Sequence, residues 1–186
     1  MKTILAFTGR KGSGKSTIAQ ALKTNNPAFK SAVILSFAEP LKRMAKEILQ
    51  ADAFLTENKE KTEYGLCGKT PRIILQTLGT EWGRNCVGEG IWTEIMKNRL
   101  LSASTPQLVL IDDLRFENEA LMLKKFPNTY IIQVDRYLSE TTTDPHPSER
   151  GIPSNLIDLK LLNNSQAKIK KICRNWTLGL DSPLKL

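Results

Sequence analysis

A short run near the N-terminus has the residue types and the spacing that hold nucleotide phosphates. Residues 9–16 read Gly-Arg-Lys-Gly-Ser-Gly-Lys-Ser, which fits the Gly-x4-Gly-Lys-Ser/Thr pattern of a phosphate-binding loop. Glycines let backbone N–H groups approach phosphate oxygens, and a helix after the loop offers its positive N-terminal end. In such a loop Lys15 would bridge the β- and γ-phosphates and Ser16 would ligate Mg²⁺. The expected nucleotide contacts come from Gly12, Ser13, Gly14, Lys15, Ser16 and Thr17.

Two aspartates supply the second group that such a loop needs, a carboxylate at the end of a neighbouring strand. Asp112 and Asp113 directly follow the apolar run Leu-Val-Leu-Ile at residues 108–111. Asp112 fits the simple strand-end pattern, whereas Asp113 begins the run Asp-Leu-Arg. One of them should hold the metal, and the other would cap a helix that starts near Phe116.

Cationic residues in several separate segments favour a kinase over other nucleotide-binding proteins. A kinase needs them to clamp an acceptor phosphate and to neutralise the transferring group, although surface ion pairs are an equally good account of any single one. An Asn-Lys-x-Asp run typical of GTPases is absent from the sequence, and 186 residues are few for a helicase-type motor. The cations concerned are Lys42, Arg72, Arg84, Arg115, Arg136 and Arg150.

Apolar runs alternate with helix-like stretches, which predicts an α/β fold around a mostly parallel sheet. The expected strands are residues 2–8, 32–37, 107–111, 129–134 and 156–162. The expected helices are residues 15–23, 40–49, 72–85, 91–102, 116–125 and 166–176, and Pro71 suits a first helical turn. The phosphate loop would then join the first strand to the first helix, which is the context that separates it from an incidental glycine-rich turn.

Length and composition indicate one compact domain without a membrane span. The chain has 186 residues, 40% of them hydrophobic, and its apolar runs are strand-sized. The N-terminus lacks the long apolar stretch of a secretory signal, and three irregularly spaced cysteines suit reduced thiols in a cytoplasm, which would be the host's if the protein is viral. The net charge of +8 indicates an anionic partner. Because no basic block is interleaved with aromatics, we expect no dedicated nucleic-acid binding.

Several runs occur together in an order that resembles the deoxynucleoside monophosphate kinases of tailed bacteriophages. They are Phe-Ala-Glu-Pro-Leu-Lys at 37–42, Gly-Lys-Thr-Pro-Arg at 68–72, Leu-Gln-Thr-Leu-Gly-Thr-Glu-Trp-Gly-Arg at 75–84, Asp-Leu-Arg-Phe-Glu-Asn-Glu at 113–119 and His-Pro-Ser-Glu at 146–149. With the phosphate loop, the resemblance covers residues 3–170. The Gly-Thr-Glu-x-x-Arg and Asp-x-Arg-Phe-x-Asn-Glu runs are its most specific parts.

The resemblance implies a P-loop kinase with a five-stranded parallel sheet and two excursions. Residues 38–91 would bind the acceptor, a deoxynucleoside monophosphate (dNMP), and residues 137–155 would form a lid. Arg72, Gln76 and Arg84, at i, i+4 and i+12 of one predicted helix, are expected to share a face. The arginines would bind the acceptor phosphate and Gln76 the base edge, with a solvated helix surface as the alternative. Trp82 and Trp92 would stack on a base or pack in the core.

The remaining implied roles fall on the core and the lid. Lys15, Arg115 and Arg136 are the expected catalytic residues, and Asn164, after the last strand, would contact adenine or cap a helix. His146 would orient the lid by hydrogen bonding or act on the substrate. The full set of expected substrate contacts is Lys42, Arg72, Gln76, Arg84, Trp92, Asp113, Glu119, His146, Glu149 and Arg150.

The resulting hypothesis is a cytoplasmic enzyme that transfers the γ-phosphoryl of ATP to a dNMP, with Mg²⁺. A kinase of another small acceptor, such as dephospho-coenzyme A or a sugar acid, is the alternative within enzymes. A DNA-stimulated ATPase that exploits the +8 charge is the alternative from another class. The sequence leaves open which bases are accepted and whether the chain forms a homodimer.

Overall fold

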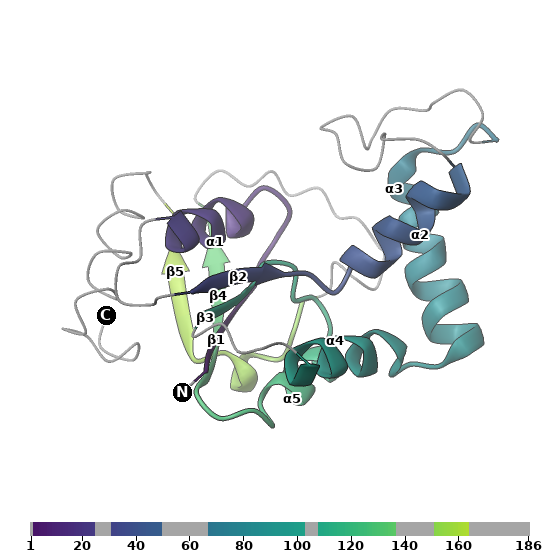
Figure 1. Ribbon diagram of the computed structural model, residues 1–186. Coiled ribbons are helices and arrows are strands. Elements are labelled where there is room, and N and C mark those ends of the chain that lie inside the picture. Colours follow the sequence, from purple (N-terminus) through teal and green to yellow (C-terminus); the bar gives the residue numbers. More distant parts are fainter. Residues whose placement is uncertain (1, 25–30, 50–66, 103–107, 137–150, 164–186) are drawn as a thin grey trace. The chain divides into compact units, whose positions relative to one another are not determined.

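A sheet of five parallel strands forms the centre of the fold (Figure 1). The computed structural model describes residues 2–24, 31–49, 67–102, 108–136 and 151–163. Within them the strand order is β2-β3-β1-β4-β5, and each neighbouring pair is parallel. The five-stranded parallel sheet predicted from the sequence is therefore confirmed. The strands are β1 (Thr3–Thr8), β2 (Ala32–Leu35), β3 (Leu108–Ile111), β4 (Thr129–Asp135) and β5 (Leu159–Leu162).

The helices match most of the predicted ones. They are α1 (Lys15–Thr24), α2 (Glu39–Leu49), α3 (Pro71–Gln76), the π-helix η2 (Thr77–Val87), α4 (Ile91–Ser102), α5 (Glu117–Leu123) and the 3₁₀ turn η4 (Ser154–Leu156). Pro71 occupies the first helical position of α3, as predicted, and the Thr70 hydroxyl caps that helix by accepting from the Ile73 N–H at 3.3 Å. The helix predicted over residues 166–176 lies outside the described residues.

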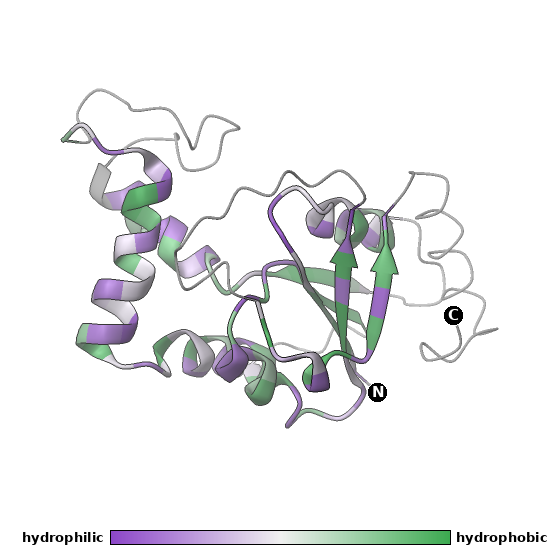
Figure 2. Cartoon of the chain, turned by 180° about the vertical axis from the view of Figure 1, so that it is seen from behind, coloured by the Kyte–Doolittle hydropathy of each residue, from purple (hydrophilic) through white to green (hydrophobic). Residues whose placement is uncertain are grey.

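Side-chain alternation along the strands builds the core around α1. Leu5 and Phe7 of β1 pack with Ile132 and Val134 of β4 against the buried face of α1, which includes Ile18. The intervening residues of β1 are also buried, as expected for a central strand of a parallel sheet. Figure 2 shows hydrophobic residues along the strands and hydrophilic residues in the loop between β1 and α1. The polar chemistry is thus concentrated at the carboxyl ends of the strands.

Strand β5 begins later than the sequence predicted, at Leu159 rather than at residue 156. The carboxylate of Asp158 accepts from the Ile131 N–H at 2.6 Å and pairs with Lys124 at 2.5 Å, while the Asp158 N–H donates to the Ile131 carbonyl at 2.9 Å. These bonds tie Asp158 to the neighbouring strand β4. The residues before it form the 3₁₀ turn η4, so regular pairing with β4 starts only after Asp158.

The chain divides into two compact units. The first comprises residues 1–36 and 99–186 and contains the sheet, and the second comprises residues 37–98. The excursion predicted over residues 38–91 lies inside the second unit. Among the described residues no helix combines the length and the apolar character that a membrane crossing requires.

A helix was predicted over residues 72–85, and its expected α-helical spacing is wrong. It is α-helical only to Gln76 and continues as the π-helix η2 to Val87. A π-helix closes i→i+5 hydrogen bonds and is rare and short in most proteins. Its wider turn changes the angle between successive side chains, so the shared face expected for Arg72, Gln76 and Arg84 cannot be read from α-helical spacing.

Candidate active site

The loop between β1 and α1 is closed around the ammonium group of Lys15. The Lys15 Nζ donates to the carbonyls of Gly9 and Arg10 at 2.7 and 2.8 Å and lies 3.5 Å from the Ser13 Oγ. The residue is only 8% exposed although it carries a charge. Its ammonium group is therefore fixed inside the loop that precedes α1, where a nucleotide phosphate would meet it.

Two glycines of this loop have no room for a side chain. A Cβ on Gly9 would lie 2.2 Å from the Val134 carbonyl, and a Cβ on Gly14 would lie 2.2 Å from the Asn163 Nδ2. Both also have φ in the left-handed region, +136° and +95°, where side chains are strained. Gly9 is thus required by the backbone of β4 as well as by its own φ, whereas Gly14 is required mainly by its φ, because the Asn163 side chain can move.

Asn163, directly after β5, fastens the loop from outside. Its Nδ2 donates to the Ser13 carbonyl at 2.8 Å, and its backbone N–H donates to the Asp135 carbonyl at 2.7 Å. Sequence reasoning named the following residue, Asn164, which lies outside the described residues. The signal for Asn163 was its position at the carboxyl end of a strand in a parallel sheet, where ligand sites gather.

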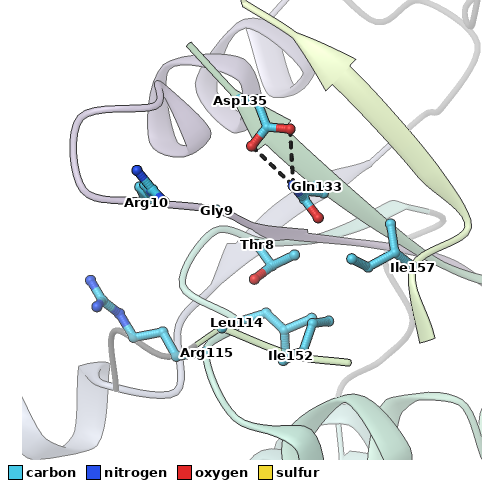
Figure 3. A pocket seen from close by; sticks show the side chains of 10 residues that line it. Thr8, Gly9, Arg10, Leu114, Arg115, Gln133, Asp135, Ile152 and Ile157 are labelled. Atoms are coloured by element: carbon cyan, nitrogen blue, oxygen red, sulfur yellow. Dashed lines mark hydrogen bonds between the residues drawn. The ribbon is translucent and has the colours of Figure 1, made fainter. Parts of the chain in front are cut away.

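Arginines from three elements lie around the loop. The Arg136 Nη1, just after β4, donates to the Gly12 carbonyl at 3.5 Å. Arg115, after β3, and Arg10, in the loop itself, line one cavity of about 240 Å³ (Figure 3). The structure thus brings Arg115 and Arg136, both predicted as catalytic, to the same strand ends as Lys15 within the first unit. Arg10, for which the sequence indicated no role, joins them.

The two aspartates differ in their surroundings. The Ser36 Oγ, at the end of β2, donates to Asp113 at 2.5 Å, and the Ser36 carbonyl accepts from Arg99 at 3.1 Å. Asp112 directly follows β3, which pairs with β1 beside the phosphate loop. Both are half-buried. Both side chains belong to the strand-end region of the first unit, so oxygen donors suited to Mg²⁺ are present there.

Glu119 has a structural role that the sequence did not predict. It is 3% exposed, and its Oε2 accepts from the backbone N–H groups of Arg115 and Phe116 at 3.0 and 3.1 Å. A glutamate at the third position of a helix satisfies otherwise unpaired N–H groups in this way. Glu119 therefore fixes the segment that carries Arg115.

The predicted acceptor residues of the second unit differ in burial. Lys42, Arg72 and Gln76 are half-buried, whereas Arg84 is 9% exposed and its Nη1 donates to the Glu89 carbonyl at 3.3 Å. Arg84 is therefore not on a solvated helix surface.

Trp92 packs against the π-helix. It is 4% exposed, its Nε1 donates to the Gly79 carbonyl at 2.8 Å, and a Cβ on Gly83 would lie 2.5 Å from its ring. Trp82 is 40% exposed, with its ring centroid 6.4 Å from that of Trp92. Of the two tryptophans, Trp92 thus has the contacts of a core residue.

The remaining predicted residues lie outside the described part of the chain. They belong to the segment expected to form the lid and to the segment after the last strand: His146, Glu149, Arg150 and Asn164.

Comparisons with known proteins agree with this strand-end chemistry. The chain is 34% identical to the deoxynucleoside-5′-monophosphate kinase of Escherichia phage T5 in an alignment 126 residues long, which covers 63% of this chain and 48% of that protein. The chain thus spans about half the length of this curated relative.

Two solved kinases cover nearly all of the chain at low similarity. An APS kinase of Mycobacterium tuberculosis is 19% identical with a TM-score of 0.45, covering 97% of this chain and 98% of its own. A shikimate kinase of Acinetobacter baumannii is 14% identical with a TM-score of 0.49, covering 100% of this chain and 97% of its own. At these scores neither adds to the identification.

A family model carries the assignment. The model named deoxynucleotide monophosphate kinase matches residues 69–172, more than half of the chain. The matched region contains both of the more specific runs noted above. The chain therefore belongs to the deoxynucleotide monophosphate kinase family.

Proposed function

We propose that the protein transfers the γ-phosphoryl group of ATP to a deoxynucleoside 5′-monophosphate, which gives the diphosphate and ADP. The observation that carries this proposal is the buried ammonium group of Lys15, held by loop carbonyls at 2.7 and 2.8 Å between β1 and α1. A buried cation in a loop at a helix N-terminus suits a polyphosphate. Membership of the family supports a dNMP as the acceptor.

In this proposal the loop binds the triphosphate and Lys15 changes partners. Phosphate oxygens replace the carbonyls of Gly9 and Arg10 as acceptors from the Lys15 Nζ, so the positive charge of Lys15 neutralises part of the charge of the β- and γ-phosphates. Backbone N–H groups at Gly12, Ser13, Gly14 and Thr17 supply further donors, and Asn164 remains our candidate for an adenine contact.

The oxygen donors fit Mg²⁺. The Ser16 hydroxyl, at the start of α1, and one carboxylate of Asp112 or Asp113 would hold it, which matches the preference of this ion for a few protein oxygens plus substrate phosphates. When bound, the ion neutralises charge on the transferring phosphates. Ser36 orients Asp113 by its hydrogen bond, whereas Asp112 follows the strand beside β1; both therefore remain candidates.

Arginines would stabilise the transferring group. Phosphoryl transfer depends on alignment and charge neutralisation rather than on a protein base. Arg136, just after β4, suits that role because its Nη1 donates to the Gly12 carbonyl of the loop, and Arg115, after β3, suits it because it lines a cavity together with Gly9 and Arg10. Glu119 keeps the backbone of Arg115 in place.

Several residues of the second unit are proposed as acceptor contacts. Arg72 and Arg84 are proposed for the acceptor phosphate, Gln76 for its base edge and Lys42 for a supporting contact. Trp92 would act only indirectly, by packing against the π-helix that carries Arg84. His146, Glu149 and Arg150, from residues 137–155, complete the proposed set.

A panel of acceptors tests the function. ADP formation is measured in a coupled assay with each dNMP, each ribonucleotide monophosphate, dephospho-coenzyme A, a sugar acid and DNA, with Lys15→Ala as the inactive control. We expect that free dNMP stimulates ADP formation by the wild type and that Lys15→Ala loses this activity. Stimulation by DNA alone, or by a non-nucleotide acceptor alone, would contradict the proposal.

A further inference from the structure

A cavity beside the phosphate loop lies at the carboxyl ends of the neighbouring strands β1 and β4. It is lined by Thr8 of β1 and the following Gly9, by Gln133 and Asp135 of β4, and by Leu114 and Arg115 after β3 (Figure 3). From β1 the chain leads to β2 at one edge of the sheet, and from β4 it leads to β5 at the other edge. Ligands of open α/β sheets bind outside the carboxyl ends of strands whose connections diverge in this way.

One wall of the cavity carries a fixed carboxylate. The Gln133 Nε2 donates to both carboxylate oxygens of Asp135, at 3.0 and 2.9 Å. The backbone of Asp135 is held as well, because its carbonyl accepts from the Asn163 N–H at 2.7 Å. A carboxylate has about four lone-pair sites, so it retains the capacity to accept from a hydroxyl of a ligand. Nothing in the sequence had singled out Gln133 or Asp135.

The other side of the cavity is cationic and adjoins Lys15. Figure 3 shows the guanidinium groups of Arg10 and Arg115 on the same side. Gly9 and Arg10 line the cavity and also supply the carbonyls that hold the Lys15 Nζ. A phosphate at this side would therefore lie next to the group that meets the γ-phosphate of ATP.

We propose that this cavity binds the sugar of the acceptor, with the Asp135 carboxylate accepting from a sugar hydroxyl and with the side lined by Arg10 and Arg115 toward the phosphoryl group in transfer. The inference rests on the proposed function. A volume of about 240 Å³ is below the ~300–1,000 Å³ of pockets that enclose a whole drug-sized ligand, so the base lies outside the cavity. Leu114, Ile152 and Ile157 supply apolar contact for the carbon atoms of the sugar ring.

A deoxynucleotide and its 2′,3′-dideoxy counterpart test the inference, because the 3′-hydroxyl is the one free hydroxyl of the deoxyribose. A hydrogen bond to a charged group predicts that wild-type kcat/KM is about 10- to 100-fold higher for the deoxynucleotide. Asp135→Ala should remove this preference by lowering kcat/KM for the deoxynucleotide only, with KM for ATP unchanged. Asp135→Asn, which keeps one acceptor oxygen and the shape, should give an intermediate preference.

A control variant and a test of folding separate loss of the sugar contact from general damage to the protein. Glu94→Ala, at an exposed position of the second unit, should keep the full preference, and thermal melting identifies any variant that fails to fold. If Asp135→Ala does not fold, an unreduced preference in Asp135→Asn overturns the inference. Equal loss for both acceptors, or a wild type that does not discriminate, also overturns it while leaving the kinase activity intact. If the wild type phosphorylates no dNMP at all, the proposed function itself fails.

Discussion

The phosphate loop of the first unit and the π-helix of the second unit both bury a cationic side chain, but they do so by different means. Lys15 is held by carbonyls of its own loop, all within six residues of it. Arg84 also donates to a carbonyl near in sequence, that of Glu89, but the helix that carries it packs against Trp92, a residue of the next helix. A local motif thus fixes the first site, whereas packing between helices shapes the second.

This difference explains why residue spacing identified the first site more completely. The glycines and Lys15 act through backbone geometry, which the motif itself encodes. The π-helix that carries Arg84 packs on Trp92 through Gly83, which leaves space for the ring, and through the Gly79 carbonyl, which accepts from the Trp92 Nε1. The comparison predicts that changes in the loop affect turnover more than stability, and that changes at the tryptophan contact affect stability first.

The largest expected effect is that of Lys15→Ala. Removing a group that neutralises charge on the transferring phosphate should lower kcat about 100- to 1,000-fold, with the melting temperature little changed because the residue contacts the loop rather than the core. Lys23→Ala, exposed in the last turn of the same helix, is the matched control. Near-normal turnover in folded Lys15→Ala protein would remove the distinction between the two regions.

Substitution of the two aspartates should have sharply different effects on the Mg²⁺ dependence of kcat. Asp112→Asn and Asp113→Asn are compared for kcat at saturating and limiting Mg²⁺, because only one is expected to contact the ion together with Ser16. That variant should need much more Mg²⁺, whereas the other should lose mainly a hydrogen bond, an effect of about 0.5–1.5 kcal/mol. Equal and mild losses would mean that neither carboxylate is a ligand.

Arg72→Ala and Arg84→Ala test the acceptor clamp. A charge-assisted contact with a phosphate is worth about 1.5–3 kcal/mol, so KM for the dNMP should rise roughly 10- to 100-fold with KM for ATP unchanged. Arg43→Ala, with its side chain 70% exposed on α2, is the control. A parallel rise in both KM values would place these arginines away from the acceptor, and the π-helix would then be a structural element only.

Gly83→Ala addresses the packing of the second unit. The added Cβ would lie 2.5 Å from the Trp92 ring, so the free energy of unfolding should fall by about 1–3 kcal/mol, as in other overpacked cores. Gly90→Ala is the control because its Cβ would be 3.6 Å from the nearest atom. Both are measured by urea unfolding. Equal stability of the two variants would show that the Trp92 contact yields easily.

The sequence predicted the sheet, most helices and the phosphate loop because each depends on local pattern. Strand-sized apolar runs gave the five strands, and Pro71 marked a helix start. It did not predict the π-helix, because i→i+5 hydrogen bonding is rare and a helical run is read as an α-helix by default. Nor did it predict the contacts of Asn163 with Ser13 or of Ser36 with Asp113, since the residues of each pair are far apart in the chain.

The smallest expected effect is that of Asn163→Ala, which asks how far the phosphate loop is fixed by its own residues. The variant removes the 2.8 Å bond to the Ser13 carbonyl, and one such bond contributes about 0.5–1.5 kcal/mol, so KM for ATP should rise about two- to tenfold. Because the loop lies within the nucleotide site and the bond lies outside it, kcat should change less than KM.

Asn163→Asp should raise KM for ATP more than Asn163→Ala does, since a carboxylate would face a carbonyl oxygen. Lys160→Ala, at an exposed position of β5, is the control. Steady-state kinetics with saturating dNMP make the measurement. If Asn163→Ala has an unchanged KM for ATP, the loop is held by its own backbone alone, and the contrast with the tryptophan-dependent π-helix becomes sharper.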